Sequence, residues 1–182
     1  MTSPYEKAPA KKRQVVLQTV FFNQAILWRN NMKSTLEHIR AFVCECPHLR
    51  EAGIRVVGAG FSSGNVSACG DISASVEIVS NAVLTRYADG AMRRYYDFDI
   101  AICAPYGVDT QTNLDMALLC ENIAAWVGEC GRNGVFPQID AGQVDWMAAK
   151  DVAHKAADTQ NTAGTARYVV PCRMAYYVAA IA

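Results

Sequence analysis

The stretch that decides the fold is VLTRYADGAMRRYYDFDIAIC, residues Val83–Cys103. Asp89-Gly90 is a tight-turn dipeptide, and it separates two runs rich in β-branched and aromatic residues, Val83–Tyr87 and Met92–Cys103. The second run has the two-residue period of a strand that buries one face, with large apolar side chains at Tyr96, Phe98, Ile100 and Ile102. The sequence therefore predicts a long β-hairpin.

The polar side of the second run is less regular than its apolar side. The polar residues Arg94, Tyr95, Asp97 and Asp99 do not all fall on one face of a regular strand. An extra residue in a strand shifts the alternation by one position. A bulge near Tyr95 would account for the pattern, and we expect one there.

Shorter strands are predicted on both sides of the hairpin. Before it, Ile54–Val57 (IRVV) precedes a loop that opens at Gly58, Gly60 and Gly64, and Ser75–Val79 (SVEIV) alternates as a second strand. After it, two further strands are predicted at Val144–Asp151 and Ala166–Ala179. Pro171 interrupts the last of these and removes a backbone donor, which favours an edge position or a bulge.

Two helices are predicted from apolar periodicity and end signals. Ser34 and Glu37 form a capping box, and Pro47 ends the apolar stripe that follows them. That stripe consists of Leu36, Ile39, Val43 and Cys46. The second helix runs from Asp109 or Thr110 to about Cys130. Its apolar face consists of Met116, Leu119, Ile123, Trp126, Val127 and Cys130.

This order of elements predicts an α+β fold, a mainly antiparallel sheet with a long hairpin, covered by two main helices. Residues 34–182 are expected to form one domain. Residues 1–33 are expected to form an N-terminal arm or extension, polar and basic up to Arg13. The mixed stretch Val15–Met32 fits a strand, a helix or both.

The composition excludes strong electrostatic binding as the main activity. The chain has 17 basic and 17 acidic residues among 182, and 52% of its residues are hydrophobic. Its apolar stretches are broken too early to span a membrane. The seven cysteines are odd in number and include no CxxC pair. We therefore expect reduced thiols in a protein made in the cytoplasm.

One short motif invites an enzymatic interpretation. Gly60–Gly64 (GFSSG) matches the G-x-S-x-G elbow of hydrolases and follows a predicted strand, so a small serine hydrolase using Ser62 and His154 is one alternative. The elbow requires a helix directly after the serine, and NVSACGDISAS (65–75) is not helical in pattern. Gly58-Ala59-Gly60 lacks the same helix that a dinucleotide loop would need. We expect no catalytic, cofactor or metal site.

The hairpin carries a second ambiguous pattern. Arg86, Arg93 and Arg94 flank three tyrosines, Tyr87, Tyr95 and Tyr96, as in surfaces that stack on single-stranded nucleic acid. The same residues also suit a half-exposed sheet face with Arg–Asp pairs across strands. The zero net charge favours the second interpretation, and a nucleic-acid-binding module stays an alternative.

The order and spacing of several pieces between Leu36 and Tyr177 carry a family resemblance. The chain resembles the tail terminator or tail completion (minor capsid) proteins of tailed phages of Gram-positive hosts. The matching pieces are Cys46-Pro47-His48-Leu49, Arg86–Gly90, Arg93–Phe98, Asn113, Ala125-Trp126-Val127, Phe136-Pro137 and Ala166–Tyr177. Residues 1–33 lie outside the family pattern. Family members usually carry a polar residue at the place of Pro171.

The resemblance implies a non-enzymatic virion protein. It implies a homohexameric ring that caps the tail tube and joins it to the head connector, with DNA only passing through the lumen. A head-completion or neck ring is the nearest alternative within this class. The expected contact residues lie on the hairpin: Arg86, Tyr87, Asp89, Arg93, Arg94 and Tyr95. The polar segment Ala157–Gly164 and the basic N-terminal arm are further expected contact regions.

Overall fold

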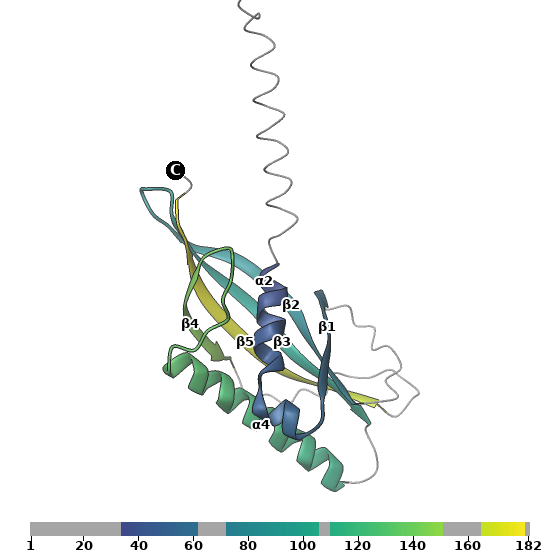
Figure 1. The fold of residues 1–182 in the computed structure, drawn as a ribbon. Helices are drawn as coiled ribbons and strands as arrows, with labels where there is room; N and C mark the ends of the chain where they lie inside the picture. The colour runs from purple at the N-terminus through teal and green to yellow at the C-terminus, as the bar shows by residue number, and fades with distance from the viewer. Residues whose placement is uncertain (1–33, 62–71, 106–109, 151–164, 181–182) are drawn as a thin grey trace, which may run out of the picture. The chain divides into compact units, whose positions relative to one another are not determined.

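A computed structural model describes residues 34–61, 72–105, 110–150 and 165–180 (Figure 1). The predicted N-terminal arm, residues 1–33, lies outside this range. The helices are α2 (Thr35–Cys44), α3 (Pro47–Glu51) and α4 (Thr110–Arg132). The strands are β1 (Arg55–Phe61), β2 (Ser73–Arg86), β3 (Met92–Pro105), β4 (Gln143–Ala149) and β5 (Thr165–Val178).

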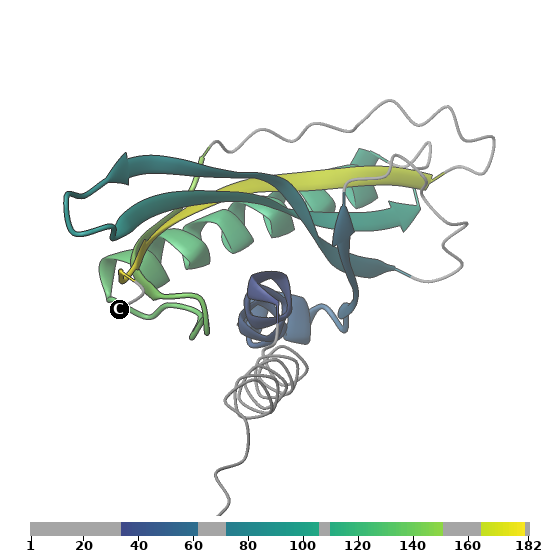
Figure 2. The same cartoon turned by 90° about the horizontal axis from the view of Figure 1, so that it is seen from above.

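The five strands form one sheet in the order β1-β2-β3-β5-β4. Only β1 and β2 are parallel, and the other three pairs are antiparallel. The helices lie on one side of this sheet, with α2 and α4 next to each other (Figure 2). The predicted α+β fold, a mainly antiparallel sheet covered by helices, is therefore confirmed.

The core lies between the helices and the face of β3 that the sequence marked as apolar. Tyr96, Phe98, Ile100 and Ile102 are all buried there, as the alternation predicted. Buried side chains of α2 and α4 belong to the same core cluster, and the two helices meet where Phe42 stacks on Trp126 with ring centroids 5.0 Å apart. The helix-free face of the sheet is formed by the alternate residues.

The helix predictions hold, with one change at Pro47. The capping box is present. The Glu37 carboxylate accepts a hydrogen bond from the backbone N–H of Ser34, and the Ser34 hydroxyl accepts one from the backbone N–H of Glu37. The helix α2 ends at Cys44, but Pro47 then begins the short helix α3 as its first residue. A proline is tolerated at that position because its missing N–H would have no partner inside the helix.

The strand predictions before the hairpin were too fragmented. The loop expected from Gly58 is wrong at its start, because β1 continues through Gly58 and Gly60 to Phe61. Ser75–Val79 and the first hairpin arm belong to one strand, β2. The pairing of β2 with β3 shifts between Ile78 and Ser80 and again between Val83 and Thr85. These bulges break the alternation and hide the continuity from the sequence.

The bulge expected near Tyr95 is also misplaced. The pairing of β3 with β5 runs without a shift from Met92 to Pro105. Tyr95, Asp97 and Asp99 share the helix-free face, and Arg94 lies on the opposite face with Tyr96. The irregularity of this hairpin therefore belongs to its other arm, β2.

Pro171 lies beside the end of β4, the second neighbour of β5. The strand β4 pairs with β5 only between Cys172 and Tyr177. At Pro171 the carbonyl accepts a hydrogen bond from the backbone N–H of Lys150, at 2.7 Å, and pairing stops there. The strand β5 is an inner strand between β3 and β4, so the edge strand expected for this proline is wrong, and the β3–β5 pairing has no bulge there either. The proline lies instead beside the end of β4. None of the described helices has the length and hydrophobicity needed to cross a membrane.

The helix α4 approaches β4 so closely that a glycine is required. A Cβ on Gly131 would overlap the carbonyl oxygen of Met147, whereas a Cβ on Gly128 would meet only the flexible end of Arg132 at 3.5 Å. We predict that Gly131→Ala lowers the free energy of unfolding by about 1–3 kcal/mol, the range for overpacking.

Gly128→Ala in the same helix is the matched control. It should raise the free energy of unfolding, since alanine is favoured over glycine in helices by about 1 kcal/mol. Urea unfolding followed by circular dichroism measures both variants. Equal effects of the two substitutions would contradict the close approach at Gly131.

Candidate interaction surface

The tip of the hairpin is built by the predicted Asp-Gly turn. The Asp89 carboxylate accepts a hydrogen bond from the backbone N–H of Ala91 at 2.9 Å, and Gly90 adopts a φ of 89° that favours glycine. Tyr87 and Ala91 close the turn through their backbones. Asp89 is exposed but holds the turn. Its expected role in contacts would therefore be combined with a structural one.

Arg86 and Tyr87 are the candidate residues most open to a partner. Arg86 is exposed, and within the described part of the chain its guanidinium donates a hydrogen bond to the Met92 sulfur at 3.5 Å. The Tyr87 ring is 44% exposed and rests against Tyr177, with 5.9 Å between ring centroids. A guanidinium and an aromatic ring at a projecting tip are residue types enriched in protein interfaces.

The other three candidate residues are held by partners within the sheet. Arg93 lies 3.0 Å from the Asp145 carboxylate of β4, and the Arg94 side chain donates to Asn81 at 3.1 Å. Tyr95 lies under the Arg173 guanidinium, 4.8 Å from the ring centroid. These contacts match the interpretation of this hairpin as a sheet face with cross-strand pairs.

Asp97 is the centre of the charged network on the helix-free face. Its carboxylate accepts two hydrogen bonds from Arg173, at 2.6 and 2.9 Å, and one from the Ser80 hydroxyl at 2.8 Å. The Lys150 ammonium lies 3.0 Å away. The residue is only 6% exposed. The bidentate Arg173 is the main reason that the pKa of Asp97 is far below its usual range.

A second ion pair lies on the same face, nearer the start of β2. Glu77 accepts a hydrogen bond from Arg167 at 2.6 Å, and both side chains are largely buried. In the register of the sheet, Asp99 lies opposite Glu77 of β2 and opposite Pro171 of β5. Burial raises the pKa of Asp99, and the Arg167 charge only partly offsets this effect. Two aspartates on one strand therefore have pKa values shifted in opposite directions.

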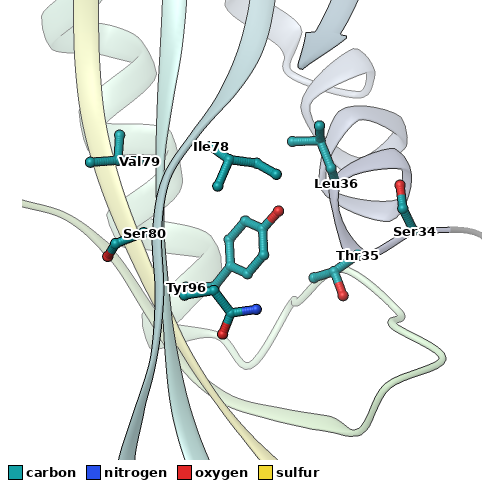
Figure 3. A pocket seen from close by; sticks show the side chains of 8 residues that line it. Ser34, Thr35, Leu36, Ile78, Val79, Ser80 and Tyr96 are labelled. Carbon is teal, nitrogen blue, oxygen red and sulfur yellow. The ribbon is translucent and has the colours of Figure 1, made fainter. Parts of the chain in front are cut away.

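A groove of about 700 Å³ opens between the start of α2 and the edge of β2 (Figure 3). Leu36 and Thr35 form one wall, and Ile78 and Tyr96 face them from the sheet (Figure 3). Burial raises the pKa of Tyr96 to about 12, so its hydroxyl is protonated at neutral pH. The lining offers apolar contact and hydroxyl groups, without a nucleophile–base pair.

The described cysteines behave as small apolar side chains. Six of them, all but Cys69, lie in the described range and are free thiols, and four of those are buried. Burial raises the pKa of Cys120 to about 11 and raises those of Cys46, Cys130 and Cys172 as well. A raised pKa keeps a thiol protonated and poorly reactive.

Two sequence hypotheses concern residues that the structure does not describe. Ser62 and His154, the residues of the hydrolase alternative, both lie outside the described residues, as does Ala157–Gly164. Within the described ranges, no group of three or more His, Cys, Asp or Glu side chains could hold a metal ion.

Comparison with known proteins adds no family to these findings. No protein-family model matches the chain, and no curated protein matches it in sequence. The resemblance to tail completion proteins therefore rests on the motifs of the sequence itself.

Sequence reasoning missed most of the charged network. It noted that aspartates lie close to the hairpin arginines, but the partners are distant in sequence. Arg173 is 76 residues from Asp97, and Arg167 is 90 residues from Glu77. The alternation of β5 places both arginines on one face, which is the signal that could have found them. The strand order needed to pair them is a tertiary property.

We predict different effects on the free energy of unfolding for the isosteric substitutions Asp97→Asn and Asp99→Asn. Asp97→Asn should lower the free energy of unfolding at pH 7 by about 2 kcal/mol, because Arg173 and Lys150 lose a buried anion. Asp99→Asn should leave that free energy unchanged or raise it, because its charged form is disfavoured by burial. Urea unfolding of both variants at pH 7 measures the difference.

The two aspartates should also affect the pH dependence of stability in opposite directions. A lowered pKa in the folded state means that Asp97 stabilises the fold above its unfolded pKa of about 3.9, and that this contribution is lost as the pH falls through the folded value. The loss of stability of the wild type in acid should therefore be shallower in Asp97→Asn. Asp99 works in the opposite direction, because protonation removes its penalty. Identical acid profiles for the wild type and Asp97→Asn would refute this account.

Proposed function

We propose that this protein is a non-enzymatic structural subunit of a bacteriophage tail, a tail terminator or tail completion protein. Its copies would form a ring, a homohexamer by the family resemblance, that caps the tail tube and joins it to the head connector. Its partners are then other copies of itself, the tail tube protein and connector proteins. DNA passes through the lumen without specific binding. The protein is made in the host cytoplasm and ends in the virion.

The motifs that carry the family resemblance support this proposal because they build one domain. Cys46-Pro47-His48-Leu49 forms the junction of α2 and α3, with Cys46 and Leu49 buried. Ala125-Trp126-Val127 lies in α4, and Trp126 stacks on Phe42 of α2. Ala166–Tyr177 forms most of β5. The matching residues are thus those that determine how this sheet and its helices pack.

The distribution of apolar and charged side chains carries the assignment to a protein assembly. In the described residues, seven of the ten large exposed apolar side chains belong to the sheet, its hairpin turn or the residue before β2: Val57, Ile72, Val79, Leu84, Tyr87, Trp146 and Tyr177. The other three, Leu114, Leu118 and Val135, lie on α4 or just after it. The basic side chains Arg93, Lys150, Arg167 and Arg173 are instead paired with carboxylates of the sheet. Exposed apolar surface favours contact with other protein subunits. Arginines engaged in such pairs are less available to phosphates.

Deletion of the gene from its phage tests the proposal. We expect negative-stain electron microscopy of the lysate to show filled heads beside unjoined tails, some of them abnormally long. Tails of normal length with neck proteins missing would favour the neck-ring alternative. Intact virions of normal length would refute a role in joining heads to tails.

Complementation of the same deletion tests the hairpin contacts. We predict that the double substitution Arg86→Ala with Tyr87→Ala lowers the yield of infectious particles at least tenfold, because both side chains lie exposed at the projecting tip. Glu129→Ala, at an exposed position of α4, is the matched control and should restore the wild-type yield. Full rescue by the hairpin variant would contradict a contact role for the tip.

A further inference from the structure

The hairpin tip, residues 86–89, presents three kinds of side chain within four consecutive positions. Arg86 and Asp89 are exposed and carry opposite charges, and the Tyr87 ring between them is 44% exposed. The hydrogen bond that holds the turn uses one oxygen of the Asp89 carboxylate, Oδ1. The tip therefore offers a cation, an aromatic ring and an anion to a partner.

The groove between α2 and β2 has one charge of each sign beside its two walls. On the helix wall, Ser34 donates hydrogen bonds from its backbone N–H and its hydroxyl to one oxygen of the Glu37 carboxylate, Oε2. On the sheet wall, Asn81 accepts a hydrogen bond from Nε of Arg94 at 3.1 Å. An anion and a cation thus border the groove.

The interior of the groove suits an aromatic side chain. Leu36 and Ile78 line opposite walls, and the Tyr96 hydroxyl points into the groove (Figure 3). Tyr96 is 3% exposed, and its hydroxyl has no hydrogen-bond partner among the described residues. A buried hydroxyl normally has such a partner. The groove volume of about 700 Å³ lies within the range of about 300–1,000 Å³ that holds drug-sized ligands, so one aromatic ring fits.

We propose that the hairpin tip of one copy of the chain docks in the groove of the next copy. Tyr87 enters the groove, and Arg86 pairs with the Glu37 carboxylate on the helix wall. Asp89 pairs with the Arg94 guanidinium on the sheet wall. The inference rests on the ring in the proposed function and names the two surfaces that join its subunits.

The position of both surfaces on β2 makes this a contact between copies. The groove is lined by Ile78–Asn81 of β2, and the same strand continues to the tip, paired with β3 along the way. Six residues from Asn81 to Tyr87 span about 20 Å at the rise of a β-strand. A tip therefore does not reach the groove of its own chain. Contacts that join two different surfaces close a ring when the rotation between copies divides a full turn.

The two charge pairs fix how the tip enters the groove. With Arg86 at the helix wall, both pairs join opposite charges. In the reversed orientation, Arg86 would meet Arg94 and Asp89 would meet Glu37, so like charges would face each other at both ends. Complementary charges of this kind give specificity and orientation to an interface.

The tip can release Tyr87 with little loss of contact. In the single chain its ring rests against Tyr177, and the two residues are 44% and 38% exposed. Changes of side-chain rotamer are common when proteins bind each other. In the groove the ring gains apolar contact with Leu36 and Ile78, and its hydroxyl approaches that of Tyr96. Aromatic and arginine side chains of this type are enriched among residues that contribute most to binding.

Two charge reversals in the full-length chain test the contact from its two sides. Arg86→Glu reverses the tip, and Glu37→Arg reverses the groove. Glu129→Arg, at an exposed position of α4, is the matched control. Sedimentation velocity over a concentration series should show a closed oligomer for the wild type and the control. Each reversed variant should associate at least tenfold more weakly, because like charges then meet.

Glu37 also belongs to the capping box, so folding is measured separately. Thermal unfolding by circular dichroism identifies any variant that fails to fold. Glu37→Gln keeps the capping box, in which glutamine is accepted, but removes the charge. This variant should fold and still associate more weakly than the wild type.

The equimolar mixture of Arg86→Glu and Glu37→Arg is the decisive sample. The reversed tip of the first variant fits the reversed groove of the second, and the unchanged tip of the second fits the unchanged groove of the first. The mixture should therefore regain the wild-type sedimentation coefficient as a ring of alternating copies. Reversed variants that assemble like the wild type, a mixture of folded variants that stays dissociated, or a wild-type chain that is monomeric throughout would overturn the docking of tip in groove.

These outcomes are separable from those of the proposed function. Restored assembly in the mixture, together with intact virions after gene deletion, would refute the tail assignment and leave the contact standing. Unjoined tails after deletion, together with reversed variants that still assemble, would leave the tail role standing and refute the contact.

Discussion

The two-faced central strand β3 is the constraint on which the rest of the structure depends. Its even-numbered residues from Tyr96 to Ala104 are buried under the helices, while Asp97 and Asp99 point to the other face. A shift of one residue in its pairing would move the aspartates into the apolar core. Such a shift would cost several kcal/mol for each unpaired buried charge. The pairing of β3 with both neighbours is therefore strongly fixed.

The charges of β3 in turn order the strands around it. Asp97 joins three elements, because its partners Ser80, Arg173 and Lys150 come from β2, β5 and the end of β4. A buried carboxylate with this many donors is stable only when all of these strands are in register. The same network neutralises the helix-free face from within. Large apolar side chains such as Val79, Leu84 and Trp146 remain exposed on the sheet.

The projecting hairpin follows from unequal strand lengths, because β2 and β3 have 14 residues each and β1 has 7. The strands β2 and β3 continue past the end of β1, so β3 is the one strand that pairs with Val79–Arg86 among the described residues. The turn at Asp89-Gly90 is closed by local hydrogen bonds and needs no support from a neighbour. The chain thus combines a helix-covered centre with an exposed hairpin tip. Such a division suits the structural role proposed above.

The sequence by itself determined the elements whose signals are local. The hairpin, the capping box at Ser34 and the apolar face of α4 depend on residues within a few positions of one another, and all three are confirmed. The continuity of β2 was missed because bulges interrupt its alternation. All six candidate contact residues lie on the hairpin, but the sequence did not show the partners that hold Asp89, Arg93, Arg94 and Tyr95 there. Those partners required the strand order.

Only the tertiary structure decided which distant residues meet. The sequence shows that Arg167 and Arg173 share a face of β5, but it does not show that β5 lies beside β3. Strand order depends on the free energy of packing the whole sheet under α2 and α4, to which every element contributes. The half-length of β1 and β4 matters for the same reason. Their lengths are local, but the opposite ends that they occupy are set by the pairing of the complete sheet.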